Sequence, residues 1–360
     1  MTAADPDGDL EVHFIDVGQG DATLLVAPDA TVLVDAGRHD RSDVMPYLVG
    51  AGVDTLDLVA ITHPHADHLG QFEQVIRGLD VAEVWWSGST HTTQTFDRAL
   101  AALEDSGAAY EEPRSGDATA LGSLTIDILN PPSDHSLDDL HDAGLAMRIT
   151  YGDVRFLFTG DAEAGTERRM VDADPDLVSA DVYQVGHHGS QTSTSQPFLD
   201  AMAPQIAVYS AGDGNQYGHP HAEVIDRLAD ASVAVYGTDV HGSLVITTDG
   251  DQISVHPEPD ELLVAGAGSG PSPEPAPDPE PEPTANDAPP SPADGDCLPE
   301  QVDINAADFE ELQRIHQVGP DRAAQIIDLR PFSSMSALER VSGIGPVYLQ
   351  QIRDEGIACA

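Results

Sequence analysis

The sequence predicts a mixed α/β (α+β) domain, then a tether, then a small all-α domain. Short apolar runs of strand and helix length, separated by turn residues, recur through residues 11–255. The composition then changes to a proline-rich, acidic segment at residues 258–296, which cannot bury a core and should be disordered and extended. Helical runs joined by Gly-Pro turns follow it. We therefore expect domains at residues 8–257 and 297–360, joined by a linker at residues 258–296.

The elements of the first domain follow from apolar runs that end at turn residues. In chain order, strands are expected at Val12–Val17, Ala22–Val26, Thr31–Val34, Leu56–Thr62, Ser123–Leu129, Leu145–Tyr151, Val154–Thr159, Ile206–Tyr209, Ala234–Tyr236, Ser243–Thr247 and Gln252–Val255. Helices are expected at Phe198–Met202 and Ala222–Leu228. This order indicates many meander strands rather than one regular doubly wound sheet.

The chain is strongly acidic, with a formal net charge of −48, and because it contains no lysine all 15 of its basic residues are arginine. Such a surface suits molar salt, where the Debye length shrinks to about 3 Å and self-repulsion is screened. The recurring apolar runs exclude an acidic disordered protein. We therefore predict a halophile's protein. Its acidity does not exclude DNA as a partner, because molar salt also screens the repulsion between acidic groups and phosphates.

A histidine cluster follows the strand expected at Leu56–Thr62. The motif THPHADHLG places His63, His65, Asp67 and His68 within six positions. A strand end exposes a short loop on which alternate side chains converge, so the first two histidines can hold one metal ion. Asp67 and His68 can hold a second. Imidazole and carboxylate ligands favour zinc, with manganese and iron as alternatives. The sequence therefore predicts two divalent metal ions at this loop.

Further metal ligands are expected downstream, again at strand ends. Asp161 follows the strand in FLFTGDAE, where a carboxylate can bridge two cations; it could also cap the helix expected after it. His187 and His188 follow a strand in YQVGHHGS, and we expect one of them, with His187 preferred, to bind metal. His141 is the candidate for the remaining ligand.

Taken together, HPHADH, TGDAE and GHHGS resemble the motifs of the metallo-β-lactamase superfamily. The segments FIDVGQGDATLLVAPDATVLVDAG, NQYGHPHAEVIDRL and TDVHGSLVITTDG resemble its ComEC branch, the soluble domain of the competence DNA-uptake channel. The resemblance covers about residues 10–256 and implies a four-layer αββα sandwich. Two positions depart from the family pattern. Ala143-Gly144 stands where an Asn-Ser pair is usual, which leaves the ligand from this segment open, and Gln191 stands where a lysine is common.

The resemblance favours a DNA phosphodiester as substrate, so we expect a metal-dependent phosphodiesterase or nuclease. Asp67 is expected to orient the nucleophile, and His188 or His219 to donate a proton to the leaving oxygen. His219 could instead belong to a turn that opens the helix at Ala222. The chemistry also permits a lactone, a thioester or a phosphorylcholine ester. The departure at Ala143-Gly144 leaves open a DNA-binding protein without catalysis.

The last domain carries two similar turns, each followed by a helical run. Together with the preceding VDINAADFEELQRI, the turns resemble the tandem helix-hairpin-helix domain of the ComEA-type competence receptor, which implies sequence-nonspecific DNA binding. Tight glycine turns let backbone N–H groups face a phosphate. The expected DNA-binding residues are Gly319, Pro320, Arg322, Gly343, Ile344, Gly345 and Pro346. Other arginines that could contact phosphate are Arg314, Arg340 and Arg353. A helical docking domain that binds no DNA is the alternative.

Cys297 and Cys359 bracket this last domain and are a candidate disulfide, with two unrelated thiols as the alternative. A disulfide would indicate an oxidising compartment. No apolar run approaches the roughly 18 residues that span a membrane, and the polar start lacks the layout of a signal peptide. We therefore expect a cytoplasmic protein if Met1 is the true start, with a secreted or cell-surface protein as the alternative. DNA-uptake machinery is a candidate partner.

Overall fold

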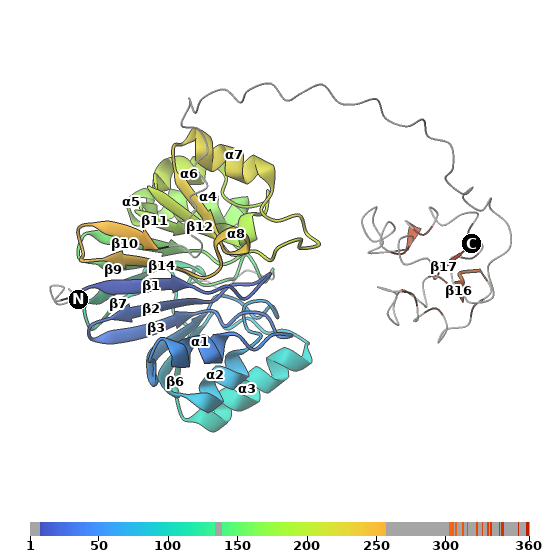
Figure 1. Ribbon diagram of the computed structural model, residues 1–360, viewed down its shortest axis with the longest axis horizontal. Helices are drawn as coiled ribbons and strands as arrows, with labels where there is room; N and C mark the ends of the chain where they lie inside the picture. The colour runs from blue at the N-terminus through green and yellow to red at the C-terminus, as the bar shows by residue number, and fades with distance from the viewer. Residues whose placement is uncertain are drawn as a thin grey trace, which may run out of the picture. The chain divides into compact units, whose positions relative to one another are not determined.

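The computed structural model describes residues 8–133 and 139–256 and, further on, single residues and short pieces between 302 and 359. The chain divides into two compact units, Met1–Pro271 and Ser272–Ala360. In the first unit two β-sheets stack face to face, and helices cover the outer face of each sheet (Figure 1). This is the four-layer αββα arrangement that the sequence predicts.

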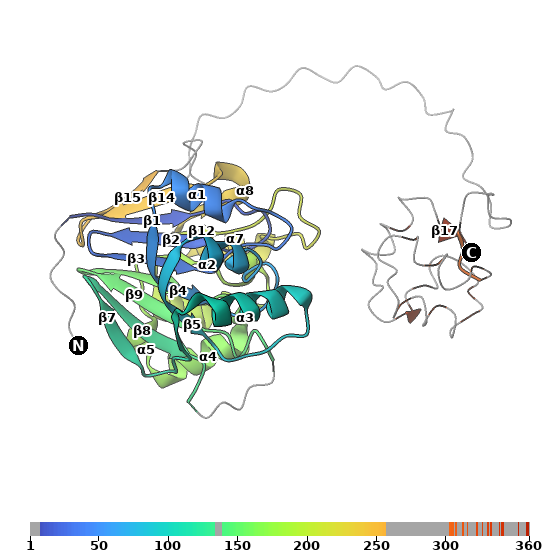
Figure 2. The same ribbon diagram turned by 90° about the horizontal axis from the view of Figure 1, so that it is seen from below.

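The first sheet has the strand order β15-β14-β1-β2-β3-β4-β5-β6. Its strands are β1 (Leu10–Phe14), β2 (Thr23–Ala27), β3 (Ala30–Val34), β4 (Thr55–Ile61), β5 (Asp80–Trp86), β6 (Ala109–Glu111), β14 (Leu244–Thr248) and β15 (Ile253–His256). Pairing is antiparallel from β15 to β3 and parallel from β3 to β6. Parallel neighbours need long crossovers. These contain α1 (Val44–Gly50), α2 (Phe72–Gly78) and α3 (Gln94–Ser106), which lie on one side of the sheet (Figure 2).

The second sheet has the strand order β13-β12-β11-β10-β9-β8-β7. Its strands are β7 (Ala118–Leu121), β8 (Leu124–Asn130), β9 (Ala146–Tyr151), β10 (Val154–Phe158), β11 (Val182–Gln184), β12 (Ile206–Tyr209) and β13 (Ala234–Gly237). The helices that follow β10 are α4 (Ala164–Ala173), α5 (Pro175–Val178), α6 (Gln196–Met202), α7 (Ala222–Asp230) and α8 (Thr238–His241), with a 3₁₀ turn at Gly186–Gly189. The strands from β10 to β13 are parallel, so their carboxyl ends meet at one edge of the sheet.

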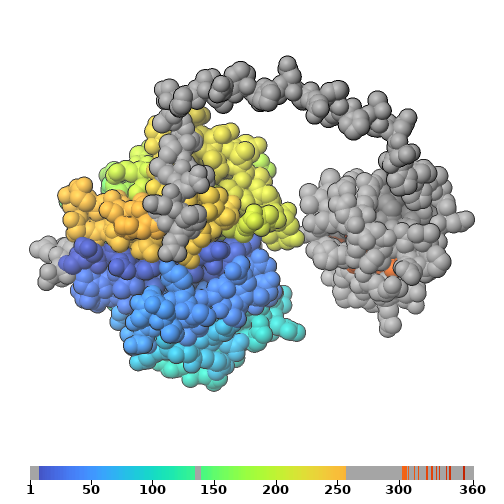
Figure 3. Space-filling model, viewed as in Figure 1, coloured from blue at the N-terminus to red at the C-terminus, as the bar shows by residue number. Residues whose placement is uncertain are grey.

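The main core lies between the two sheets. Fully buried side chains from both sheets meet there, among them Phe14 from β1, Tyr151 from β9 and Phe156 from β10. Two further apolar clusters lie under the helices, one on the outer face of each sheet. The last strands, β14 and β15, return to the first sheet beside β1, which the space-filling view shows as orange against blue (Figure 3). The described part of the first unit therefore begins and ends in the same sheet.

The described residues of the second unit form a small apolar core of their own. Its buried members are Val302, Ile304, Ala307, Leu312, Ile315, Ile326, Phe332, Leu338, Val341 and Ile352. A short parallel pair joins β16 (Val302–Asp303) to β17 (Ala358–Cys359). Arg330 donates hydrogen bonds from its guanidinium to the carbonyl oxygens of Ile304 and Ala307, so this arginine supports the fold. In the part of the chain that the structure describes, every helix is too short or too polar to cross a membrane.

Candidate metal centre

The histidine loop starts where β4 ends and is anchored by a buried carboxylate from the neighbouring strand. Asp35 directly follows β3, which runs parallel to β4. Its Oδ1 accepts a hydrogen bond from the backbone N–H of Thr62 at 2.7 Å, and its Oδ2 accepts one from the Thr62 hydroxyl at 2.8 Å. Asp35 therefore fixes the first residue of the loop that carries the predicted ligands.

Asp161 lies at the centre of the cluster, after β10 of the second sheet. Gly160 precedes it with a φ of 50°, and a Cβ there would lie 2.8 Å from the Thr62 side chain, so only glycine allows this approach of the two loops. The Asp161 Oδ2 lies 3.6 Å from His63 Nε2, whereas its Oδ1 lies 3.2 Å from His68 Nε2. The two oxygens of one carboxylate thus face different histidines, as a bridging ligand does.

The first ligand group consists of His63, His65 and His141 with the Oδ2 atom of Asp161. Their candidate ligand atoms all lie within 4.8 Å of one another. The Nδ1 of His65 lies 2.9 Å from His63 Nε2 and 3.2 Å from His141 Nε2. The structure therefore brings His141 to the site even though Ala143-Gly144 replaces the usual pair beside it.

The second ligand group consists of His68, His188 and Asp21 with the Oδ1 atom of Asp161, and Asp67 lies beside it. His188 Nε2 lies 3.8 Å from Asp161 Oδ1 and 3.4 Å from Asp67 Oδ2. His68 and His188 are fully buried, whereas the Asp67 side chain keeps 34% of its surface exposed. Asp21 is also buried, and its carboxylate lies 3.8 Å from the Nδ1 atoms of both histidines.

The ring nitrogens that face away from this second group have hydrogen-bond partners. His68 Nδ1 lies 2.8 Å from Asp35 Oδ2, and His188 Nδ1 lies 3.0 Å from the carbonyl oxygen of Ser210. Because both partners accept hydrogen bonds, each Nδ1 is assigned a proton, and each Nε2 is the ring nitrogen that faces Asp161. Outer partners of this kind orient histidine ligands in metal sites.

The buried atoms of the second group fit a cation. In the described residues, His68 Nε2, His188 Nε2 and Asp161 Oδ1 are buried without a hydrogen-bond partner. An unsatisfied buried polar atom costs about 1–3 kcal/mol, so three together indicate a missing counterpart. Tetrahedral ligands at about 2.1 Å from zinc lie about 3.4 Å from one another. The separations here, 3.2 and 3.8 Å, bracket that value.

The charges of the cluster are strongly coupled. Burial opposes the charged form of His68, but the carboxylates of Asp161 and Asp35 raise its pKa well above the usual range. Burial likewise opposes the charged form of Asp161, but His68 and His188 hold its pKa well below the usual range. In the protein alone a proton on His68 therefore balances carboxylate charge. A divalent cation would balance the same charge more completely.

His187 and His188 are adjacent but face different parts of the centre. Their φ angles of 52° and 55° put both in the left-handed region inside the 3₁₀ turn, so the backbone turns sharply between their side chains. His187 Nε2 lies 3.7 Å from Asp161 Oδ2, at the rim of the first ligand group, and its Nδ1 lies 3.9 Å from Glu163. The sequence predicts that one of the two binds metal, with His187 preferred and His188 as a proton donor. In the structure His187 lies in a cluster with His141 and Glu163 that could hold a cation, and His188 lies deeper, among the buried ligand atoms.

His219 lies beside the cluster, outside both ligand groups. Its ring centroid is 5.7 Å from that of His187 and 6.3 Å from that of His188. Burial, with the charges of His188 and His187, lowers the pKa of His219 to about 4. Gln19 Nε2 lies 3.4 Å from its Nδ1, which leaves Nε2 as the protonated ring nitrogen. His219 is therefore a neutral imidazole with one N–H group to offer a substrate.

Sequence reasoning missed the buried carboxylates Asp21 and Asp35. Asp21, in GQGD, directly precedes an apolar run, and Asp35, in VLVD, directly follows one. An aspartate at the end of a buried strand is the signal that could have identified them. The predicted glycines and prolines of the helix-hairpin-helix turns and Cys297 lie outside the described residues. Arg322 is described and half-buried, and Cys359 forms part of β17.

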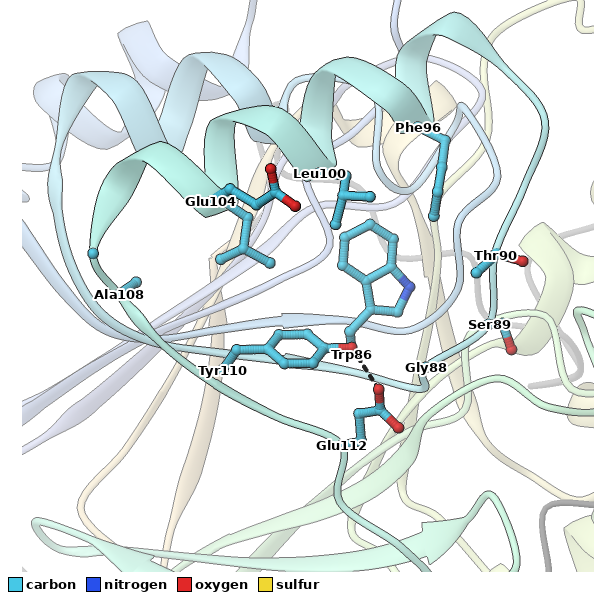
Figure 4. A pocket seen from close by; sticks show the side chains of 12 residues that line it. Trp86, Gly88, Ser89, Thr90, Phe96, Leu100, Glu104, Ala108, Tyr110 and Glu112 are labelled. Carbon is cyan, nitrogen blue, oxygen red and sulfur yellow. Dashed lines mark hydrogen bonds between the residues drawn. The ribbon is translucent and has the colours of Figure 1, made fainter.

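Two hollows differ in chemistry. A cleft of about 460 Å³ opens beside the second ligand group and includes Asp67, Arg38 and Tyr217 in its lining. A hollow of about 430 Å³ lies between α3 and β6, and its lining includes Trp86 and Leu100 (Figure 4). None of the predicted metal ligands lines the second hollow, so the cleft is the candidate substrate site.

A dinuclear-type cluster of histidine and aspartate, at the edge where two stacked sheets meet, defines the class of a metallohydrolase. The family comparison identifies the particular superfamily. A model described as "Metallo-beta-lactamase superfamily" matches residues 15–213, more than half of the chain, so the chain belongs to that superfamily. A model described as "Helix-hairpin-helix motif" matches residues 299–355, which makes the second unit a small, mainly α-helical domain of the helix-hairpin-helix type.

Several relatives are similar in sequence to this chain over about 250 residues. The chain is 30% identical over 253 residues to ComE operon protein 3 of Bacillus subtilis, covering 65% of this chain and 32% of that protein. It is 29% identical over 255 residues to Recombination protein 2 of Haemophilus influenzae, covering 68% and 30%. It is 28% identical over 246 residues to Competence protein ComA of Neisseria gonorrhoeae, covering 66% and 32%. The chain thus matches about a third of the length of these relatives.

Proposed function

We propose that the chain is a metal-dependent phosphodiesterase that cleaves DNA, with a second unit that holds DNA near the site. The observation that carries this proposal is the bridging carboxylate of Asp161, whose two oxygens face two separate histidine groups. Two divalent cations held there, zinc by preference, would supply charge stabilisation for a phosphodiester and acidify an attacking water. The similarity to competence and recombination proteins supports DNA as the substrate.

The side chains of the chain take three roles in this proposal. His63, His65 and His141 would hold one cation, and His68 and His188 would hold the other. Asp161 would contribute a ligand oxygen to each. Asp67, one-third exposed, reaches from beside the second group into the cleft and orients the attacking water there. This arrangement assigns His188 to binding rather than to proton transfer.

His219 is proposed to act on the substrate rather than on the cations. With a pKa near 4 it is neutral at neutral pH, and its Nε2–H can donate a hydrogen bond to an oxygen of the phosphodiester. A neutral imidazole is a weak acid, so we assign it the stabilisation of developing charge rather than full proton transfer to the leaving oxygen. His187, at the rim with Glu163, borders the same space.

The second unit is proposed to raise the local concentration of DNA. Helix-hairpin-helix motifs contact phosphates without reading bases, and tethering converts the encounter with the site into an intramolecular event. Within the described residues of this unit, Arg330 is committed to backbone carbonyls. The phosphate contacts are assigned to the residues that the sequence predicts, around the turns at Gly319 and Gly345 and including Arg322.

The test is cleavage of linear single- and double-stranded DNA in molar KCl with zinc or manganese. We expect the intact protein to cleave and Asp67→Ala to lose cleavage while it keeps its fold by circular dichroism. An intact protein that binds two metal ions and hydrolyses lactones, thioesters or phosphorylcholine esters, but no DNA, would favour the small-ester hydrolase. One or no metal per chain, with no turnover of any ester, would favour a DNA-binding protein without catalysis.

A further inference from the structure

The loop between β12 and α7 projects from the body of the first unit (Figure 1). Tyr217 is 54% exposed. One side chain builds the loop: Asn215 Oδ1 accepts hydrogen bonds from the backbone N–H groups of Tyr217 at 3.1 Å and His219 at 3.0 Å. Its Nδ2 donates to the carbonyl oxygens of Gly212 and His219. Tyr217 is therefore presented to solvent by an internally hydrogen-bonded backbone.

Three rings lead from this exposed position to the metal centre. The Tyr217 ring stacks on His219, with centroids 5.6 Å apart and an interplanar angle of 27°. The His219 ring in turn stacks on His188 at 6.3 Å and 30°. His188 belongs to the second ligand group. One face of Tyr217 is thus supported from below, and more than half of its side chain is open for another flat ring.

Tyr217 shares a cleft with Asp67, which lies beside the second ligand group. The cleft of about 460 Å³ has Tyr217, Gln216 and Asn215 along one wall, and Asp67 and Arg38 among its other lining residues. Pockets for small ligands start at about 300 Å³, so one flat group and its attached phosphate fit this volume. A group that lies on Tyr217 is therefore held next to Asp67, whose carboxylate contacts His188 of the second ligand group.

Arg38 supplies a cation to this cleft, in a chain with 15 arginines and no lysine. Its backbone packs against the histidine loop, because a Cβ at Gly70 would lie only 2.3 Å from the Arg38 carbonyl carbon. The next residue, His39, donates its backbone N–H to the carbonyl oxygen of Ala66 at 2.9 Å. The guanidinium donates to both oxygens of Asp40 and keeps 34% of its side chain exposed. The backbone of Arg38 is thus fixed against the loop that carries Asp67.

We propose that Tyr217 and Arg38 form a nucleotide subsite next to the metal centre. A nucleobase stacks on the open face of Tyr217, and the phosphate attached to that nucleotide is held by Arg38. The following phosphodiester then lies at the ligand groups. This inference rests on the proposed phosphodiesterase function and names its substrate class: a base can stack on Tyr217 only when it is unpaired, so single strands and frayed ends enter the subsite.

Stacking also solves a problem that the charge of this chain creates. Proteins ordinarily gain affinity for nucleic acid by releasing counterions from phosphates, an effect that salt weakens steeply. A chain with a formal net charge of −48 has few cations for this purpose. Base–aromatic stacking involves no net charge and is retained in molar salt. Through this subsite a strongly acidic protein can bind DNA in molar salt.

The test compares thymidine 5′-monophosphate with 2-deoxyribose 5-phosphate, which lacks the base, as ligands of the full-length, manganese-loaded protein in molar KCl. Calorimetry should show that the nucleotide binds roughly 5- to 150-fold more tightly, the range expected for one stacked base. Tyr217→Ala should abolish this ratio, and Tyr217→Phe, which keeps the ring, should retain it. Arg38→Gln should weaken both ligands by a similar factor. Leu100→Ala, a change at an apolar residue 41% exposed in the other hollow, should alter neither affinity.

Cleavage assays then separate this inference from the proposed function. Single-stranded oligonucleotides with a base or an abasic site beside the scissile bond should differ in kcat/KM for the intact protein and for Tyr217→Phe, but not for Tyr217→Ala. A base preference that survives in Tyr217→Ala, or equal binding of the two monophosphates by the intact protein, overturns the subsite. If no variant cleaves DNA while the binding ratio still depends on the ring, the phosphodiesterase proposal fails and the subsite stands as a binding site.

Discussion

The two ligand groups share Asp161 but differ in how they are supported. In the second group, His68 and His188 are fully buried, and each has an outer partner on the opposite ring nitrogen, Asp35 for one and Ser210 for the other. In the first group, the His141 side chain is 23% exposed. Within the described residues, no hydrogen bond is found for the remaining ring nitrogen of His65 or His141.

This difference predicts that the two groups bind metal with different affinity. Ligands whose rotamers and tautomers are fixed in advance lose little freedom on binding, and their outer partners also raise their basicity. Exposed ligands must be ordered by the ion itself. We therefore expect the second group to hold its ion tightly and the first group to hold an ion that exchanges more readily.

Removal of both ions is the largest change that tests this comparison. A strong chelator should abolish cleavage and lower the melting temperature, because bound metal stabilises only the folded state. If free metal exceeds its dissociation constant a thousand-fold, the loss is about 4 kcal/mol, or roughly 8–16 °C for a unit of this size. Calorimetric melts with and without chelator measure it, and restored metal should reverse it. An unchanged melting temperature would contradict tight binding at the second group.

Asp161→Asn should come next, because one substitution affects both groups. The amide keeps the volume of the carboxylate, but it loses the negative charge and one of the two ligand oxygens. We expect at most one weakly bound ion per chain by elemental analysis and at least roughly a hundred-fold loss of cleavage. Asp153→Asn, in the exposed turn after β9, is the matched control and should retain both ions. Two ions retained in Asp161→Asn would disprove the bridging role.

Asp35→Asn should weaken the second group selectively. The carboxylate accepts hydrogen bonds from the Thr62 N–H, the Thr62 hydroxyl and His68 Nδ1, and the nitrogen of an amide can accept none of them. We expect a metal affinity about 10–100-fold lower for the tighter ion and a loss of about 1–3 kcal/mol in the free energy of unfolding. Chelator competition resolves the two ions. An equal shift of both ions would show that the groups are not independently supported.

His141→Ala should have the smallest effect. It removes one exposed ligand from the group that is less supported, so the tighter ion and the melting temperature of the protein should be almost unchanged. We expect loss of the weaker ion and a fall in cleavage that added metal partly restores. His256→Ala, on the exposed edge strand β15, is the control and should behave like the intact protein. Loss of both ions in His141→Ala would reverse the order of the two groups.

The strands and the central ligands were accessible from sequence because their signals are local. Each expected strand has a counterpart in the structure, although β1 ends at Phe14 rather than Val17, since Ile15 already pairs with Ala22 in a turn. Strands β5, β6 and β7 were not predicted; in β6 all three residues are exposed, so no alternation of buried and exposed residues marks it. Helix α2 was not predicted because it has only seven residues and no side-chain cap. Its apolar pattern is therefore too short to indicate a helix.

The sequence by itself determined the kinds of ligand, their places at strand ends, the two units and the acidic charge. Each follows from neighbours along the chain. The tertiary structure decided which oxygen of Asp161 faces which histidine, that His188 rather than His187 lies deepest, and that Tyr217 shares a cleft with Asp67. These relations join loops from both sheets, and the loops meet only when the core between the sheets has packed.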